Sequence, residues 1–404
     1  METLLEYSGK LLRNFQVNIL DSILNDYHPD PKEYRRIRNQ YPGTRGWEVI
    51  SDIINKLKTE DGFDDSKLEE RLFTDLTENI PDNYYIYDFV HSKTYEEIVA
   101  EFKKNTALLN TPIYTFDIRD RDSLQIVSIR LKEKEKKIII LLRYGYTYGE
   151  ESNTNSLIFF IPCVLDFHNK MLIIKFREIH RKKSKKKINK LLPQVINCIK
   201  NLNDDFTFNG YGKKKIHSTL YEMFKVESAR AEKLIKSSSD SHTDEELNNN
   251  INTFLTKQLS IPASSKEIES YTNRIKSIYY QNIASQLEEI SFGNRYMFAF
   301  AFFDGLSTKS TTRDAGRFNV YNKKLYWTLK DLIHTEQKIT ELSMYYKFNP
   351  KNFDAEIEGE NFYFVEATLK ESYGSLMIDF YKNKFDSTRG IRNGYVISEI
   401  KKYL

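Results

Sequence analysis

Basic side chains are concentrated in one short stretch of this sequence, between Arg177 and Lys190. Eight of its fourteen residues are basic, against one acid, Glu178. The basic residues are Arg177, Arg181, Lys182, Lys183, Lys185, Lys186, Lys187 and Lys190. Like charges at this density repel one another, and they are tolerated most easily where a polyanion lies nearby. The chemistry indicated is neutralisation of phosphate groups, which releases condensed counterions and makes binding depend on salt.

A second group of cations, Lys213, Lys214 and Lys215, follows a glycine-containing segment at 210–212. A helix is expected between the two groups, and if it returns the chain, both border one groove. The sequence therefore predicts binding of nucleic acid or another polyanion. Two alternatives stay open: a solvated loop or localisation signal, and a docking surface for another protein.

Tyr144, Tyr146 and Tyr148 alternate along a predicted strand and so share one of its faces. Aromatic faces stack on nucleobases whatever their sequence. Packing in a core or interface explains the same alternation. Because these tyrosines lie close in sequence to the basic stretch, we include them among the candidate nucleic-acid-binding residues.

A metal-dependent nuclease needs two or three carboxylates around a metal, often with a lysine nearby. The nearest such set is Asp354, Glu366 and Lys370. Glu366 and Lys370 are four residues apart and would share a face of a strand. These three residues are the candidates for the alternative function, a nuclease in the C-terminal part of the chain.

Other catalytic chemistry finds no support. The segment at 210–215 lacks the earlier glycine and the hydroxyl residue after lysine that a phosphate-binding P-loop requires. The seven histidines show no metal-ligand spacing, and no nucleophile-elbow motif is present. We expect no metal and no cofactor. The sequence favours a non-catalytic role without deciding the question.

Charge is distributed unevenly along the chain, although the formal net charge is only +4. Residues 59–101, the acidic block, contain thirteen acids and three bases, whereas residues 175–215 contain thirteen bases and three acids. Such blocks can pair with each other within the chain or meet different protein subunits. The second possibility makes an interaction adaptor a further alternative function.

Two cysteines provide neither a disulfide framework nor a metal set, which indicates a reducing compartment. The N-terminus lacks the apolar block of a signal peptide. No apolar run approaches the roughly 18 residues that a membrane helix needs. We therefore expect a cytoplasmic protein that does not contact a membrane.

The elements that position these residues indicate a multidomain α+β protein, since 404 residues exceed one ordinary core. Apolar periodicity predicts an N-terminal helical domain over 1–110 and a central α/β domain with a small sheet and the basic patch over 111–236. A polar linker and helix follow at 237–262. An antiparallel α+β domain is expected over 263–404.

Three local patterns make sharper predictions. The segment 138–142 is apolar on both faces and should be a central strand. Asn189 should cap a helix, which would place Pro193 in the tolerant first turn. The segment RYMFAFAFF should be a strand with one face of large residues turned to a core, namely Tyr296, Phe298, Phe300 and Phe302. Its other face, under a closely packed helix, should carry Met297, Ala299 and Ala301.

Together these observations predict a non-catalytic nucleic-acid-binding component, for DNA or RNA, of a multiprotein assembly. Lys, Asn, Ile and Tyr have A/T-rich codons and are used freely, and housekeeping motifs are missing. For that reason we expect an antiviral-defence or mobile-element context.

Overall fold

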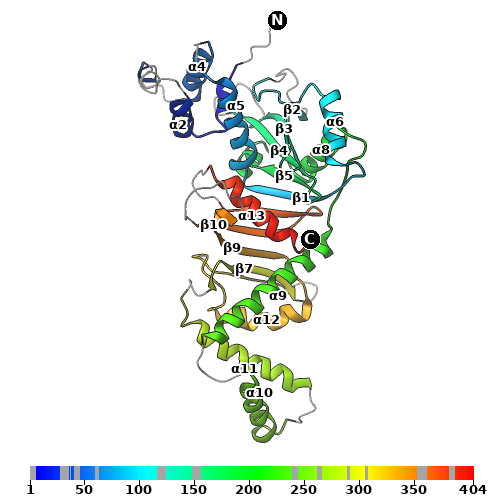
Figure 1. The fold of residues 1–404 in the computed structure, drawn as a ribbon. Coiled ribbons are helices and arrows are strands. Elements are labelled where there is room, and N and C mark those ends of the chain that lie inside the picture. Colours follow the sequence, from blue (N-terminus) through cyan, green and yellow to red (C-terminus); the bar gives the residue numbers. More distant parts are fainter. Residues whose placement is uncertain are drawn as a thin grey trace. The chain divides into compact units, whose positions relative to one another are not determined.

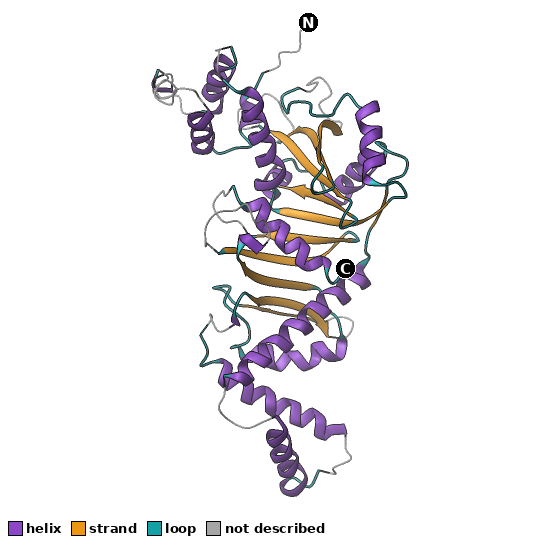
Figure 2. Cartoon of the chain, in the orientation of Figure 1, coloured by secondary structure: helices purple, strands orange, loops and turns teal. Residues whose placement is uncertain are grey.

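The computed structural model of the chain describes residues 6–27, 36, 38–40, 46–59, 63–115, 124–147, 156–238, 244–261, 266–288, 292–304, 308–352, 362–381 and 387–404. The protein is α+β, with antiparallel strands and many helices (Figure 1, Figure 2). It forms two compact units, each described by itself. The first comprises 1–211 and 382–390, and the second 212–381 and 391–404.

The first unit is built on an antiparallel sheet in the order β2-β3-β4-β5-β1, with β6 paired to β1. Its strands are β1 (Asn83–Val90), β2 (Leu124–Lys132), β3 (Lys137–Tyr146), β4 (Ile158–Asp166), β5 (Met171–Phe176) and β6 (Thr207–Asn209). All of β4 and β5 and nearly all of β3 are buried. The predicted central strand at 138–142 is confirmed within β3, because an apolar residue on either face needs a covered sheet.

Helices pack around this sheet. They are α1 (Gly9–Leu12), α2 (Val17–Tyr27), α4 (Trp47–Leu57), α5 (Asp65–Thr74), the π-helical turn η1 (Asp75–Asn79), α6 (Tyr95–Asn105), α7 (Glu178–Lys183) and α8 (Ile188–Lys200). In α4 the buried residues Val49, Ile50, Ile53, Ile54 and Leu57 recur at helical spacing. Thr94 and Glu97 form a capping box that starts α6.

The helical pattern predicted for 1–110 is wrong at β1. Its sequence, NYYIYDFV, is rich in aromatic residues and suits a buried strand better than a helix. Asn83 pairs with Phe176, far along the chain, so the strand forms through a long-range partner. Local periodicity cannot show such a partner.

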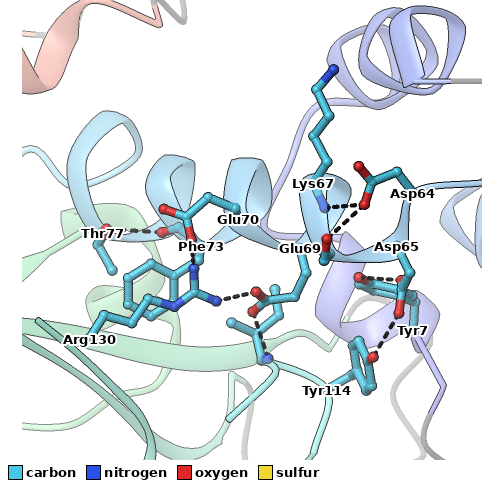
Figure 3. A network of polar contacts seen from close by, with 12 residues as sticks. Tyr7, Asp64, Asp65, Lys67, Glu69, Glu70, Phe73, Thr77, Tyr114 and Arg130 are labelled. Atoms are coloured by element: carbon cyan, nitrogen blue, oxygen red, sulfur yellow. Dashed lines mark hydrogen bonds and ion pairs between the residues drawn. The ribbon is translucent and has the colours of Figure 1, made fainter. Parts of the chain in front are cut away.

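A buried ion network holds α5 against β2 (Figure 3). The guanidinium of Arg130 contacts the carboxylates of Glu69 and Glu70 and lies 3.9 Å from the centre of the Phe73 ring. Glu69 also accepts a 3.0 Å hydrogen bond from the backbone N–H of Ile113. Part of the acidic block is therefore committed to the fold.

The second unit contains an antiparallel sheet in the order β11-β10-β9-β7-β8. Its strands are β7 (Arg295–Asp304), β8 (Thr308–Arg313), β9 (Glu341–Phe348), β10 (Tyr363–Ser372) and β11 (Ser375–Phe380). Its helices are α9 (Lys213–Ser237), α10 (Asp244–Thr253), η2 (Phe254–Gln258), α11 (Lys266–Ala284), α12 (Lys324–Glu336), η4 (Pro350–Asn352) and α13 (Arg389–Lys401).

Helices α9, α12 and α13 cover one face of this sheet (Figure 1). Phe300 on β7 packs 5.5 Å from Phe224 of α9 and 6.3 Å from Tyr326 of α12, between ring centres. Phe348 on β9 stacks 4.0 Å from Tyr395 of α13. The core of the second unit lies under these three helices.

A β-bulge between Met297 and Ala299 changes the predicted faces of β7. Tyr296 pairs with Tyr345 and Ala299 with Ser343, so Tyr296 and Ala299 share a face. The helices pack on the opposite face, beside Phe300. The prediction that Tyr296 lies with Phe300, and that the small residues lie under a helix, is therefore wrong.

None of the helices formed by the described residues has both the length and the apolar character needed to cross a bilayer.

Candidate nucleic-acid interface

The basic segment, residues 177–190, begins where β5 leaves the first unit's sheet. Its first member, Arg177, is half-buried and donates a 3.2 Å hydrogen bond to the carbonyl of Asn14. Burial lowers the pKa of Arg177; the charge of Asp82 opposes this, and the charge of Arg389 adds to it. Arg177 therefore contributes to the packing of the first unit and is less exposed than the lysines that follow it.

Arg181 forms hydrogen bonds within the basic segment that hold its conformation. Its guanidinium donates two hydrogen bonds to Glu178, at 2.6 and 2.5 Å, and one to the carbonyl of Lys186 at 3.3 Å. Burial would raise the pKa of Glu178, but the hydrogen bonds and charges of Arg181 and Lys182 outweigh it and hold that pKa below its ordinary value. Sequence reasoning missed this pair, although its spacing of three on a helix is a recognised signal.

The turn between α7 and α8 places the neighbouring lysines. The Ser184 hydroxyl donates to the carbonyl of Arg181 at 2.7 Å, and Lys185 takes a left-handed backbone conformation with φ of 56°. Lys186 lies back over the ring of Tyr144, 4.4 Å from its centre. Arg181, Ser184 and Lys186 thus fix the turn, and Lys185 and Lys187 on either side of Lys186 are exposed.

Five lysines of the segment are exposed: Lys182, Lys183, Lys185, Lys187 and Lys190. Lys182 lies 3.6 Å from the Glu178 carboxylate. Among the residues that the structure describes, no carboxylate lies within ion-pair distance of Lys185, Lys187 or Lys190. These three are the most available cations of the segment.

Two of these lysines lie at the start of helix α8. Lys187 is its N-cap residue, Lys190 lies in its first turn, and no acid accompanies them. The first N–H groups of a helix have no partner within it, and the helix dipole is positive at this end. Carboxylates normally occupy such positions, so lysines there raise an already positive potential and favour an anion.

The predicted cap of this helix is wrong. The helix begins at Ile188, before Asn189, and Pro193 lies inside it rather than in its first turn. Pro193 has no N–H, so the carbonyl of Asn189 lacks its usual helical donor. The apolar face of α8, with Leu191, Leu192, Val195 and Ile199 buried, holds the helix in place.

Two of the three tyrosines predicted to stack on bases, Tyr144 and Tyr146, are packed inside the first unit. Tyr144 is 9 % exposed and Tyr146 8 % exposed. Lys186 covers the ring of Tyr144, and Lys10 lies 5.2 Å from the ring centre of Tyr146. Tyr148 lies outside the described residues. The two described rings support the fold, as the packing alternative proposed, and present no open stacking surface.

Carboxylates of the acidic block find partners away from the exposed lysines. Their basic partners within the described residues include Lys58 for Asp65, Arg130 for Glu69, Arg130 and Lys132 for Glu70, Arg71 for Asp75, Lys175 for Glu78, Lys136 for Glu96 and Lys93 for Glu101. Lys175 is buried and donates to Glu78 at 2.5 Å and to the carbonyl of Thr77 at 3.0 Å. The two charge blocks therefore meet at Lys175, and Lys185, Lys187 and Lys190 stay outside this pairing.

The second predicted group, Lys213, Lys214 and Lys215, belongs to the second unit. All three are exposed and form the first turn of α9, whose N-cap is Gly212, with no acid in that turn. This helix start thus repeats the charge pattern of α8. The groove predicted to join the two groups remains a prediction.

The nuclease candidates do not form a metal site within the described residues. Glu366 pairs with Arg317, and Lys370 lies across the ladder from Glu341 and Met377. Asp354 lies outside the described residues. No group of three His, Cys, Asp or Glu side chains in the described part of the chain is arranged to hold a metal.

Comparison with known proteins finds no matching family model and no matching curated protein.

Proposed function

We propose that this chain binds nucleic acid through the basic segment, with Lys185, Lys187 and Lys190 neutralising backbone phosphates and Lys182 and Lys183 beside them. One observation carries the proposal. Three exposed lysines without a carboxylate partner among the described residues lie at and just before the start of α8, where the helix potential is also positive. Contacts of this kind recognise the phosphate backbone rather than base sequence.

Two features favour this proposal over a merely solvated loop. Arg181 ties the turn to Glu178 and to the carbonyl of Lys186, so the lysines extend from an internally bonded frame. The acidic block, which could have neutralised the segment, is largely paired elsewhere. A positive surface that its own chain does not neutralise is suited to an outside polyanion.

The proposed role is that of a non-catalytic component of an assembly. Exposed apolar side chains on the α10–η2–α11 hairpin support contact with another protein; they are Phe254, Leu259, Tyr271 and Ile278. The nuclease alternative gains no such support, since Arg317 already neutralises Glu366.

The deciding experiment replaces Lys185, Lys187 and Lys190 together by glutamine and measures binding of a labelled duplex by fluorescence anisotropy. A matched control replaces Lys104, Lys134 and Lys170, three exposed lysines of the same unit, and changes the net charge equally. Lys170 shares the left-handed backbone conformation of Lys185. The segment variant should lose binding at least tenfold more than the control, with unchanged melting temperature. Equal binding by the two triple variants would refute the proposal.

A further inference from the structure

Exposed aromatic rings occur on the second unit, on the sheet face opposite α9, α12 and α13. Phe362 is 45 % exposed and Phe364 is 43 % exposed. Phe364 lies on β10, directly across from Lys347 on β9, and Phe362, just before β10, contacts the ammonium of the same lysine. Two large apolar side chains so exposed are unusual when they are adjacent on one face.

The two phenylalanines end a row of rings that crosses the sheet. Tyr296 on β7 stacks on Tyr345 of β9, with ring centres 4.5 Å apart and planes within 12°. Tyr345 in turn lies 6.0 Å from Phe364. The tyrosines are half-buried and use their ring faces on each other, whereas Phe364 ends the row in solvent. A further flat ring can extend the row at that exposed end.

The surroundings of the row are positively charged. The Lys347 ammonium lies 4.3 Å from the centre of the Phe362 ring. Among the residues that the structure describes, cross-strand register and ion pairs place five cations on this face, Lys309, Arg313, Arg317, Lys347 and Lys370, with three carboxylates, Glu341, Glu366 and Asp379. Two carboxylates are paired with arginines: Glu341 with Arg313 at 3.5 Å, and Glu366 with Arg317. The described residues of this face thus carry more cations than carboxylates, beside accessible rings.

Rings that end a stack, next to cations, are the combination that binds single-stranded nucleic acid, since bases stack on the rings and phosphates meet the cations. We infer that this face binds unpaired nucleotides, with a base stacked on Phe364 or Phe362 and Lys347 near its phosphate. The inference rests on the proposed function and adds to it. The basic segment supplies phosphate contacts, and its neighbouring tyrosines Tyr144 and Tyr146 are buried. This face adds rings that end a stack beside cations.

The test compares a single-stranded oligonucleotide with a duplex of the same sequence. Phe362→Leu and Phe364→Leu are introduced together, which keeps apolar side chains and removes the rings. A control pair, Phe254→Leu and Tyr271→Leu, removes similarly exposed rings on the α10–η2–α11 hairpin of the same unit. The sheet variant should bind the single strand about tenfold more weakly than the control does, with duplex affinity unchanged.

A direct readout of stacking uses Phe364→Trp. The chain has two native tryptophans, one of which, Trp327, is 2 % exposed, so added emission reports on position 364. Oligothymidylate should quench this added emission, and a duplex should not. Quenching by a proline-rich or aromatic peptide instead would overturn the inference, because the occupant would then be a protein.

The two proposals fail separately. Unchanged single-strand affinity in the phenylalanine variant, with loss of duplex binding in the Lys185, Lys187 and Lys190 variant, overturns only the inference about the sheet face. Weaker single-strand binding by the phenylalanine variant, with unchanged duplex binding by the Lys185, Lys187 and Lys190 variant, overturns only the role of the basic segment. A wild-type chain that binds neither form overturns both.

Discussion

The carboxylate of Glu178 accepts two hydrogen bonds from the guanidinium of Arg181, at 2.6 and 2.5 Å, and lies within 3.6 Å of Lys182. The only acid of the basic segment is therefore used to fix its shape. This leaves the lysines that follow, from Lys185 to Lys190, without an acid of their own segment.

Glu178 should make stability depend on pH in the acid range. Its pKa is lower in the folded chain than its ordinary value of 4.5, so the stabilisation is complete above about pH 5 and is lost as pH falls through the folded pKa. Glu178→Gln should be less stable than wild type at pH 7, and the difference should shrink at low pH. Urea unfolding between pH 3 and 7 measures this. A difference that is constant over the whole range would contradict the ion-pair origin.

Binding by the basic segment should weaken steeply with salt. Each phosphate contact with a duplex contributes about 0.9 to the slope of log K against log salt, so Lys185, Lys187 and Lys190 account for about 40-fold between 50 and 200 mM salt. The triple glutamine variant should lose that part of the slope, and the Lys104, Lys134 and Lys170 variant should keep it. Affinity titrations at four salt concentrations provide the test, and parallel slopes for all three proteins would count against phosphate contacts here.

Removal of Arg130 should destabilise the first unit. Arg130→Met leaves Glu69, which is 7 % exposed, charged and without its cation, at a cost of about 3–5 kcal/mol in the free energy of unfolding. Adding Glu69→Gln removes the stranded charge and keeps an acceptor for the N–H of Ile113. The double variant should recover most of the loss in urea denaturation, and a double variant no better than Arg130→Met would show that the charge is not the cause.

Gly390→Ala sets two effects against each other. Alanine favours a helix over glycine by about 0.5–1 kcal/mol. A Cβ at Gly390 would lie 2.8 Å from the Cβ of Glu78, which is fixed to the backbone, and overpacking of this kind costs about 1–3 kcal/mol. We expect a net loss of stability in thermal unfolding. A rise in melting temperature would mean that the contact relaxes without cost.

Several features of the fold could be predicted because they depend on local patterns. The strand at 138–142 was recognisable from its two apolar faces, and the inner face of α8 from helical spacing. The basic segment was recognisable from charge density alone, and its exposed lysines lie at the end of α7, in the turn and at the start of α8.

Other features depend on partners distant in the sequence. β1 is a strand because its residues meet β5, and the bulge beside Met297 decides which residues of β7 face the helices. The aromatic rings proposed to stack on bases differ from those predicted from the sequence, for the same reason. Tyr144 is buried under Lys186, while Phe364 is left in solvent at the end of a row begun by Tyr296.

The sequence by itself determined the α+β class and the segment where basic residues are concentrated. Both can be read from residue types and their spacing within short stretches of the chain. The tertiary structure decided which charges are neutralised and which rings are exposed. Those outcomes depend on contacts such as Lys175 with Glu78 and Arg130 with Glu69, which form only when strands and helices far apart in the chain are brought together.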